Sequence, residues 1–91
     1  MKEFAVLFTK RAKKELSKLD VSVQKVIVAW IAKNIKGTTE PRKQGKALKG
    51  DKKGYWRYRV GNYRIIADIR DEEFVVVAVS IAHRSSVYDD F

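Results

Sequence analysis

The sequence predicts a single small α+β domain whose elements follow the order strand, helix, helix, strand, strand, strand. The 91 residues are enough for one hydrophobic core and not for two. Apolar residues recur at every second position near the start and in the last third of the chain, and at helical spacing between these parts. We therefore expect residues 1–91 to form one domain. In it, an antiparallel meander of three strands and an N-terminal strand form a sheet, and a helical hairpin packs on one face.

The first strand is expected over residues 2–8. Apolar residues occupy both faces of this segment, which predicts a strand that is covered on both sides. One face carries Phe4, Val6 and Phe8, and the other carries Ala5 and Leu7. Thr9 is a suitable helix N-cap, and the apolar residues that follow it fall at helical spacing among lysines, which predicts a short amphipathic helix. These apolar residues are Ala12, Leu16 and Leu19.

A second helix is expected to begin at Asp20 or Ser22, since both residue types cap helices well. It is expected to end before Gly37, because a glycine commonly follows a helix in a left-handed conformation. Its wide apolar stripe consists of Val23, Val26, Ile27, Trp30, Ile31 and Ile35. The two helices are predicted to form an antiparallel hairpin.

Residues 38–54 are rich in lysine and glycine and poor in apolar side chains, which predicts a long basic connection. Loops of this length are usually functional. Three strands are then expected over residues 55–60, 63–70 and 74–82, joined by tight turns at Gly61-Asn62 and at residues 71–73.

The composition narrows the class of function. Twenty Lys and Arg against eleven Asp and Glu give a net charge of +9, which attracts polyanions and favours a nucleic-acid partner over a solubilising surface or an acidic protein partner. Cysteine is absent and a single histidine does not make a zinc site, so we expect no metal and no cofactor. No segment is apolar enough to span a membrane, and the N-terminus lacks a signal-peptide pattern. We therefore expect a cytoplasmic protein.

Basic residues are concentrated between positions 42 and 64, where the sequence has nine of them and one acidic residue, Asp51. They are Arg42, Lys43, Lys46, Lys49, Lys52, Lys53, Arg57, Arg59 and Arg64. Strand alternation puts Trp56, Tyr58 and Val60 on the face that seeks the helices, and Tyr55, Arg57 and Arg59 on the other face, to which the next strand adds Arg64. Arginine forks donate two hydrogen bonds to phosphate, so this face is a candidate anion site. Tyr55, Tyr63 and Tyr88 are available to stack on unpaired bases.

The end of the last strand carries a further group of polar residues, with His83 and Arg84 adjacent and a tyrosine nearby. Histidine is the side chain that most readily transfers protons near neutral pH. A lone histidine is more often structural than catalytic, but its place at a strand end beside an arginine makes His83 a candidate for the site.

Three segments resemble one known family. They are PRKQGKALKG (residues 41–50), YWRYRVGNYRII (residues 55–66) and HRSSVY (residues 83–88), and they are similar to the RelE branch of the RelE/ParE toxins. The resemblance covers nearly the whole chain, because the order of elements matches too. It implies a RelE-like, microbial-ribonuclease-like fold and a metal-independent mRNA interferase. Such a toxin enters the ribosomal A site and cuts the codon there through attack of the ribose 2′-hydroxyl on the adjacent phosphate, which inhibits translation.

The resemblance also implies partners and residue roles. A cognate RelB-like antitoxin would neutralise the toxin in a heterotetramer, be acidic where it binds, and carry the contact with operator DNA. Arg57 and Arg59 match positions that contact the scissile phosphate, and Arg64 matches the arginine that stabilises the transition state. Arg84 matches the arginine near the leaving oxygen, and His83 matches the histidine directly before that arginine. Tyr88 matches the tyrosine that stacks on the codon. RNA binding is expected of Arg42, Lys43, Lys46, Lys49, Lys52, Lys53 and Tyr55. An arginine is a poor general base, so charge stabilisation is the expected arginine role and His83 is the remaining group for proton transfer.

Two other functions stay open on the sequence. The ParE branch shares the fold but inhibits DNA gyrase and has no nuclease activity. Its members commonly lack the basic strand pair and the terminal tyrosine, both of which this sequence has. A plain nucleic-acid-binding module, or a toxin that has lost its activity, would retain the same charge.

Overall fold

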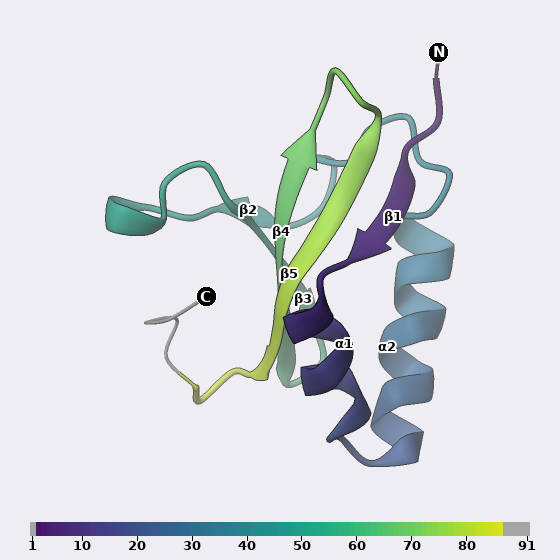
Figure 1. Cartoon of the computed structure of the whole chain (residues 1–91), viewed down its shortest axis with the longest axis vertical. Helices are drawn as coiled ribbons and strands as arrows, with labels where there is room; N and C mark the ends of the chain where they lie inside the picture. The colour runs from purple at the N-terminus through teal and green to yellow at the C-terminus, as the bar shows by residue number, and fades with distance from the viewer. Residues whose placement is uncertain (1, 87–91) are drawn as a thin grey trace.

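The computed structural model describes residues 2–86 as one layered α+β domain (Figure 1). The elements are β1 (Ala5–Phe8), α1 (Lys10–Ser17), α2 (Val21–Asn34), β2 (Lys46–Ala47), the 3-10 turn η1 (Gly50–Lys52), β3 (Trp56–Val60), β4 (Tyr63–Arg70) and β5 (Val75–His83). The described strands form one sheet in the order β1-β5-β4-β3-β2. The predicted fold class, the order of elements and the meander β3-β4-β5 are confirmed.

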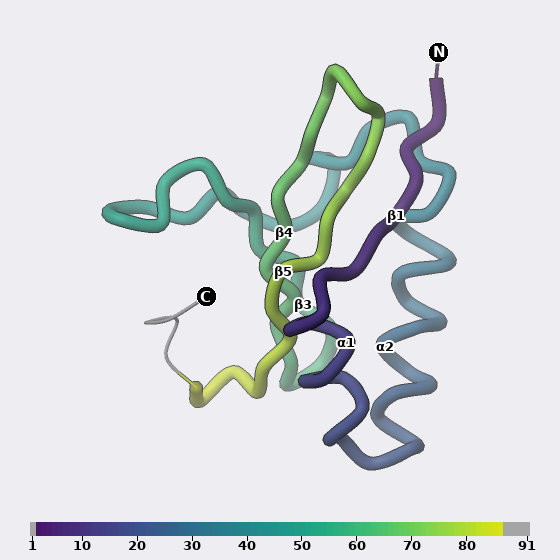
Figure 2. The backbone as a smooth tube through the Cα atoms, in the orientation of Figure 1, coloured from purple at the N-terminus to yellow at the C-terminus, as the bar shows by residue number. Residues whose placement is uncertain are grey.

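The helical hairpin packs on one face of this sheet, and the backbone trace shows α1 and α2 side by side and β1 along β5 (Figure 2). The core lies between the two layers. Buried side chains from α2, such as Ile27 and Ile31, meet Tyr58 of β3 and Ile65 of β4 there. Burial raises the pKa of Tyr58 to about 12, and its hydroxyl donates a hydrogen bond to the carbonyl of Pro41. The tyrosine therefore joins the core to the long connection.

The helix boundaries follow the predicted caps. The Thr9 hydroxyl accepts a hydrogen bond from the backbone N–H of Ala12 at 3.0 Å, as expected of an N-cap. Asp20, one of the two predicted starts, is the N-cap of α2. Gly37 has a φ of 79°, a left-handed conformation that suits glycine after a helix.

Two sequence predictions about burial are wrong. Ala5 and Leu7 are exposed, so β1 is covered on one face only, by the helices. Val26 was expected in the apolar stripe of α2, but it is 60% exposed, because the buried stripe runs through Ile27 and Ile31 on a neighbouring face of the helix. An apolar residue on the surface is common and carries no signal that separates it from a core residue.

The sheet also differs from the prediction in its edges. β1 pairs with β5 in parallel, so the sheet is mixed. The two-residue strand β2, which pairs with β3, lies inside the segment that was predicted as a loop. The strand over residues 55–60 begins one residue later, at Trp56, and the last strand runs from Val75 to His83 instead of over 74–82.

A β-bulge at Ile66/Ala67 interrupts the pairing of β4 with β5. Ile66 pairs with Ser80 and Ala67 pairs with Ala78, which leaves Val79 as the extra residue of β5. At the same level β1 ends, since Thr9 donates its backbone N–H to the carbonyl of Ala78 and its hydroxyl to the carbonyl of Val79. Beyond the bulge the edge of β5 therefore faces α1 instead of β1.

Candidate nucleic-acid interface

The arginines of β3 and β4 share one face of the sheet. Arg59 lies directly opposite Arg64 in the register, and Arg57 lies two residues before Arg59 on the same strand. Tyr58 and Val60, which alternate with the arginines, are buried on the helix face. Like charges directly opposite one another destabilise a sheet. A pair of arginines at this position therefore points to a function that needs them.

This face has an apolar floor beneath its charges. Ile66 is the cross-strand partner of Arg57, so it lies on the arginine face, and it is only 2% exposed. Its own partner on β5, Ser80, is 6% exposed. Arg57 and Arg64 are half-buried, since long aliphatic stems can cover apolar surface, and Nε of Arg64 is itself buried. A guanidinium group held over an apolar floor acts on an anion more strongly than one surrounded by water.

Glu15 of α1 closes this region at the edge of β5. Its Oε1 accepts hydrogen bonds from the Ser80 hydroxyl and from the backbone N–H of Ile81, both at 3.0 Å. Its Oε2 accepts from Nε of Arg11 at 3.4 Å. The carboxylate thus takes the place of a strand neighbour beyond the bulge and fixes the last part of β5. Glu15 was not predicted to have this role, since a glutamate in a lysine-rich helix looks like an ordinary surface residue.

The end of β5 is tied to the turn between β3 and β4, because Arg84 donates its backbone N–H to the carbonyl of Asn62 at 2.7 Å. Arg84 is exposed and follows the strand directly, next to the arginine face. Tyr88, the predicted stacking residue, lies outside the described residues.

His83 does not share the arginine face. It pairs with Tyr63, which pairs with Val60, so all three lie on the helix side of the sheet. The rings of His83 and Tyr63 meet edge to face, with centroids 5.3 Å apart. Nδ1 of His83 lies 2.8 Å from the Ser85 hydroxyl and accepts the Ser85 backbone N–H at 3.2 Å. The expected approach of His83 to the arginines is not seen, because strand alternation sends neighbouring side chains to opposite faces.

The basic residues of the long connection divide into two groups. Arg42 lies at the far end of β4, where it makes a two-pronged ion pair with Asp71, both contacts at 2.8 Å. This hydrogen bond raises the pKa of Arg42 and lowers the pKa of Asp71. Lys43, which is exposed, lines the same hollow as Arg42 and Asp71. The other lysines lie along β2, at the edge of the sheet, and around η1, which projects from the sheet (Figure 1): Lys46, Lys49 and Lys53 are exposed and Lys52 is half-buried. Tyr55, half-buried, precedes β3 and accepts the backbone N–H of Leu48 through its carbonyl.

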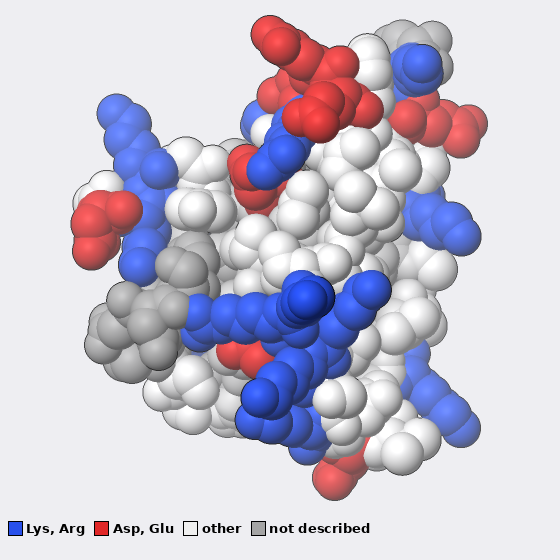
Figure 3. Space-filling view, in the orientation of Figure 1, with Lys and Arg blue, Asp and Glu red and all other residues white. Residues whose placement is uncertain are grey.

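Charge is distributed unevenly over the surface. Figure 3 shows Lys and Arg side chains gathered around the end of β5 and α1, and Asp and Glu side chains gathered at the β4–β5 turn. Within residues 2–86, no three side chains of the metal-binding kinds come together.

The sequence matches the family described as ParE toxin of type II toxin-antitoxin system, parDE, over residues 6–88. It is also 31% identical over 85 residues to the toxin RelG of Mycobacterium tuberculosis, an alignment that covers 93% of this chain and 95% of that toxin. The chain belongs to the RelE/ParE superfamily of type II toxins. Its fold agrees with this assignment. The toxin–antitoxin complex RelBE2 of M. tuberculosis contains a chain with a TM-score of 0.83 and 29% identity, covering 94% of this chain and 97% of that one.

Two further solved structures are similar to this chain in fold, at low sequence identity. The isolated RelE toxin of Escherichia coli has a TM-score of 0.72 at 22% identity, covering 93% of this chain and 88% of that one. The chromosomal ParDE system of Pseudomonas aeruginosa contains a chain with a TM-score of 0.71 at 8% identity, covering 89% and 96%. Both branches of the superfamily therefore share this architecture.

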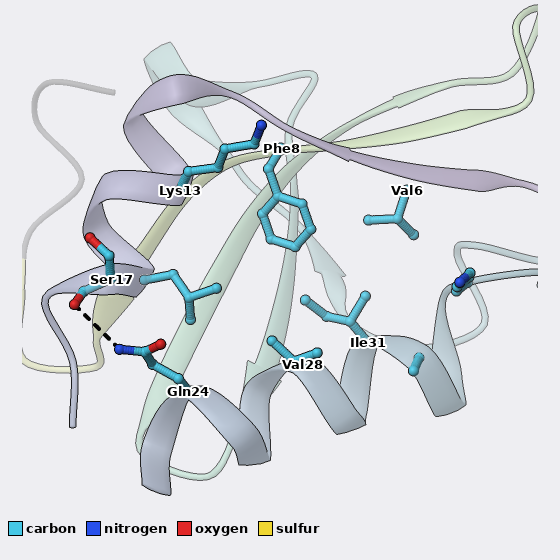
Figure 4. A pocket seen from close by; sticks show the side chains of 10 residues that line it. Val6, Phe8, Lys13, Ser17, Gln24, Val28 and Ile31 are labelled. Carbon is cyan, nitrogen blue, oxygen red and sulfur yellow. Dashed lines mark hydrogen bonds between the residues drawn. The ribbon is translucent and has the colours of Figure 1, made fainter. Parts of the chain in front are cut away.

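On its helix side the toxin has a concave surface that differs chemically from the arginine face (Figure 4). It is an apolar groove of about 420 Å³ between α1, α2 and β1, where Phe8, Val28 and Ile31 line the space. Lys13 and Lys36 also line the groove, and Gln24 closes one end by donating to the carbonyl of Ser17. The groove and the arginine face lie on opposite sides of the sheet. No described helix of the toxin has the length and apolar character that a membrane crossing needs.

Proposed function

We propose that this toxin is a ribosome-dependent endoribonuclease that cleaves mRNA in the A site and so inhibits translation. The observation that supports it most directly is the pairing of Arg59 with Arg64 across β3 and β4, with Arg57 beside them over an apolar floor. Like charges directly opposite one another disfavour the pairing of two strands, whereas a scissile phosphate can accept hydrogen bonds from these arginines. The similarity to RelG and to the toxin of RelBE2 supports the RelE branch. Such a toxin works in the cytoplasm, where the ribosomes are.

The proposed reaction needs no metal. The ribose 2′-oxygen attacks the adjacent phosphorus and loses its proton to water, the bond from phosphorus to the 5′-oxygen breaks, and the 5′-oxygen takes up a proton from water. Arg57, Arg59 and Arg64 stabilise the negative charge that builds up on the phosphorane, and Arg84 stabilises the leaving oxygen. One preorganised donor of this kind contributes roughly 2.7–4 kcal/mol, which corresponds to about 100- to 1000-fold in rate.

Charge stabilisation therefore carries most of the proposed catalysis. Arginine stays protonated at neutral pH and does not act as a general base. His83 was the expected group for proton transfer, but it contacts Tyr63 on the opposite face of the sheet and Ser85 in the turn. Its contacts give the proton-transfer role no support, and we assign His83 to the packing of the end of β5. Tyr88 keeps its proposed role of stacking on the codon.

The partners follow from the same proposal. Toxin–antitoxin complexes of similar chains are known, such as RelBE2, and the partner of this toxin is a RelB-like antitoxin. We propose that an acidic part of the antitoxin covers the arginine face, that the complex is a heterotetramer, and that operator DNA is contacted through the antitoxin. The ribosome and its mRNA complete the list of partners. The exposed lysines of the connection and Tyr55 are proposed to bind RNA, while Arg42 is engaged by Asp71 at the other end of the molecule.

Primer extension on mRNA from a purified translation system tests the proposal. We expect toxin-dependent cuts inside codons, only when ribosomes occupy the mRNA, and no change in DNA supercoiling. Intact translated mRNA together with inhibited gyrase would overturn the proposal.

The second candidate is a ParE-like gyrase inhibitor without nuclease activity. It is favoured by the family match, which carries the ParE description over residues 6–88. A supercoiling assay with purified gyrase separates the two candidates, because a gyrase inhibitor works without ribosomes. Absence of both activities, with RNA binding retained, would indicate a toxin that has lost its activity.

A further inference from the structure

A hollow of about 300 Å³ opens beside the arginine face, at the outer edge of β3. The described residues that line it come from α2, the long connection and β3: Trp30, Gln44, Gly45, Lys46, Arg57 and Arg59. Three of these side chains are cationic, one is aromatic and none is acidic. This combination differs from that of the apolar groove on the helix side, and it is the combination that binds single-stranded nucleic acid.

The wall formed by the connection is held in place by a close crossing over β3. Gly45 has a φ of 87°, and a side-chain carbon at this position would collide with the carbonyl of Arg57 and with the indole nitrogen of Trp56. The Trp56 indole N–H donates a hydrogen bond to the carbonyl of Gln44 at 2.6 Å. The chain can pass this close to the strand only as glycine, and the indole then fixes it there.

The wall formed by the helix is attached to the same segment. Gln44 donates its side-chain N–H to Oδ1 of Asn34 at 2.7 Å, and Asn34 donates to the carbonyl of Trp30 at 2.9 Å. The Trp30 ring meets Tyr58 at a tilt of 55°, with centroids 5.7 Å apart, and the residue is half-buried. Helix, connection and strand are thus joined around the hollow before any ligand arrives, which lowers the entropic cost of binding.

The edge of β3 contributes backbone groups as well. Within the described chain, β2 pairs with Trp56 and Arg57, and the pairing goes no further along the strand. Val60 and Tyr63 flank the two-residue turn, so alternation directs the N–H and C=O of Arg59 away from β4 and outward at this edge. Arg59, which lines the hollow, therefore presents its backbone groups at the same edge of β3.

We propose that this hollow is a subsite for a nucleotide next to the one at the scissile phosphate. Its phosphate would lie among Lys46, Arg57 and Arg59, and its base would lie against the indole of Trp30. Because Arg57 and Arg59 belong to both sites, consecutive phosphates of one RNA strand can occupy the arginine face and the hollow. The inference rests on the proposed function for the identity of the polymer, RNA, while the binding itself is measurable without cleavage.

Binding of two 2′-O-methyl RNA hexamers, which cannot be cleaved by 2′-oxygen attack, tests the subsite. One hexamer carries bases, and the other is abasic throughout and keeps only the phosphates. We expect Trp30→Leu to weaken binding of the first hexamer about 10-fold, in the range of one base–aromatic stack, and to leave the second unchanged. Equal loss with both hexamers, or no loss with either, overturns the role of Trp30.

Lys46→Ala supplies a test that does not depend on the core, since Lys46 is exposed. This substitution is expected to lower the affinity for both hexamers several-fold. It should also reduce the dependence of that affinity on salt concentration by the amount of about one phosphate contact. Lys33→Ala is the matched control, because Lys33 is an exposed lysine of α2 that does not line the hollow and has no proposed role in RNA binding. Equal effects of the two substitutions overturn the phosphate site at Lys46.

The outcomes separate this inference from the proposed function. If both predicted differences appear but translated mRNA stays intact, the subsite holds and the nuclease proposal fails. If mRNA is cleaved and Trp30→Leu and Lys46→Ala cleave it at the wild-type rate and at the same codons, the nuclease proposal holds and the subsite fails.

Discussion

The two ends of strand β4 differ in the charges that lie next to their arginines. Near its start, Arg64 faces Arg59 across the hairpin, so two positive charges are held side by side. Near its end, Arg70 pairs with Asp68 at 3.0 Å and with Glu73 at 3.7 Å. The second end satisfies its charges within the chain, as a stable fold favours. The first end places two arginines directly opposite each other, and both could stabilise a bound anion, which makes this end the candidate site.

The largest expected effect comes from removing one arginine at each end of this strand. Arg64→Ala should lower mRNA cleavage about 100- to 1000-fold, because it removes a donor to the phosphorane. Arg70→Ala removes the same charge at the paired end and should cleave at the wild-type rate. Cleavage in a purified translation system and thermal unfolding measure both variants. Equal cleavage by the two would abolish the distinction between the ends.

The next effect concerns the core side of the strand that carries Arg57 and Arg59. Trp56→Ala should destabilise the domain by about 3 kcal/mol, since it removes packing against the core and the hydrogen bond to the Gln44 carbonyl. Urea unfolding gives the free energy. Arg59→Ala, on the opposite face of the same strand, is the control and should unfold at or above the wild-type urea concentration. Similar destabilisation by both would mean that the two faces are not distinct in energy.

A smaller effect is expected at Glu15, the carboxylate that holds the last part of β5 beside the arginine face. Glu15→Gln should cost about 1–2 kcal/mol, because an amide accepts the hydrogen bonds of Ser80 and Ile81 less strongly than a carboxylate does. It should also raise hydrogen exchange at the end of β5. Lys14→Gln, an exposed position on the same helix, should leave both stability and exchange unchanged. Unaltered exchange in Glu15→Gln would show that the carboxylate does not hold the strand end.

The smallest effect is the pH response at the paired end. Its hydrogen bond with Arg42 lowers the pKa of Asp71 in the folded protein, so the pair stabilises the fold above the ordinary aspartate pKa of roughly 3.9 and this contribution is lost as pH falls below it. The groups are largely exposed, so we expect less than about 1 kcal/mol. Unfolding of Asp71→Asn and wild type at pH 7 and pH 3 measures it. The difference in the free energy of unfolding between the two proteins should be smaller at pH 3 than at pH 7. A larger difference at pH 3 would contradict the predicted direction of the pH dependence.

Local patterns in the sequence predicted much of this architecture. The Thr9 cap, the two helices and the meander follow from spacing that is visible within a few residues. Alternation likewise assigned Arg57, Arg59 and Arg64 to one face. Alternation within a strand determines faces, so the same rule applied to the last strand would have placed His83 with Tyr63, once the register of β4 with β5 was known.

The features that the sequence did not predict depend on contacts between distant parts of the chain. Arg42 and Asp71 lie 29 positions apart, and Glu15 and Ser80 lie 65 apart. Strand β2 is two residues long and has no apolar alternation, and it follows directly on the close crossing of the chain over β3 at Gly45, which the sequence pattern does not reveal. The hollow beside β3 needs three elements to meet, and Trp30 by itself reads as one more apolar residue of a helix.

The acidic β4–β5 turn has a consequence for how the toxin meets a charged partner. Four of the eleven acidic residues lie within positions 68–73, at the opposite end of the sheet from the arginines, in a chain of net charge +9 (Figure 3). Such a molecule has a dipole moment along its sheet. In the field of a polyanion this dipole experiences a torque, which turns the arginine end forward and the turn away before contact. Many collisions that begin in the wrong orientation are thereby corrected during approach.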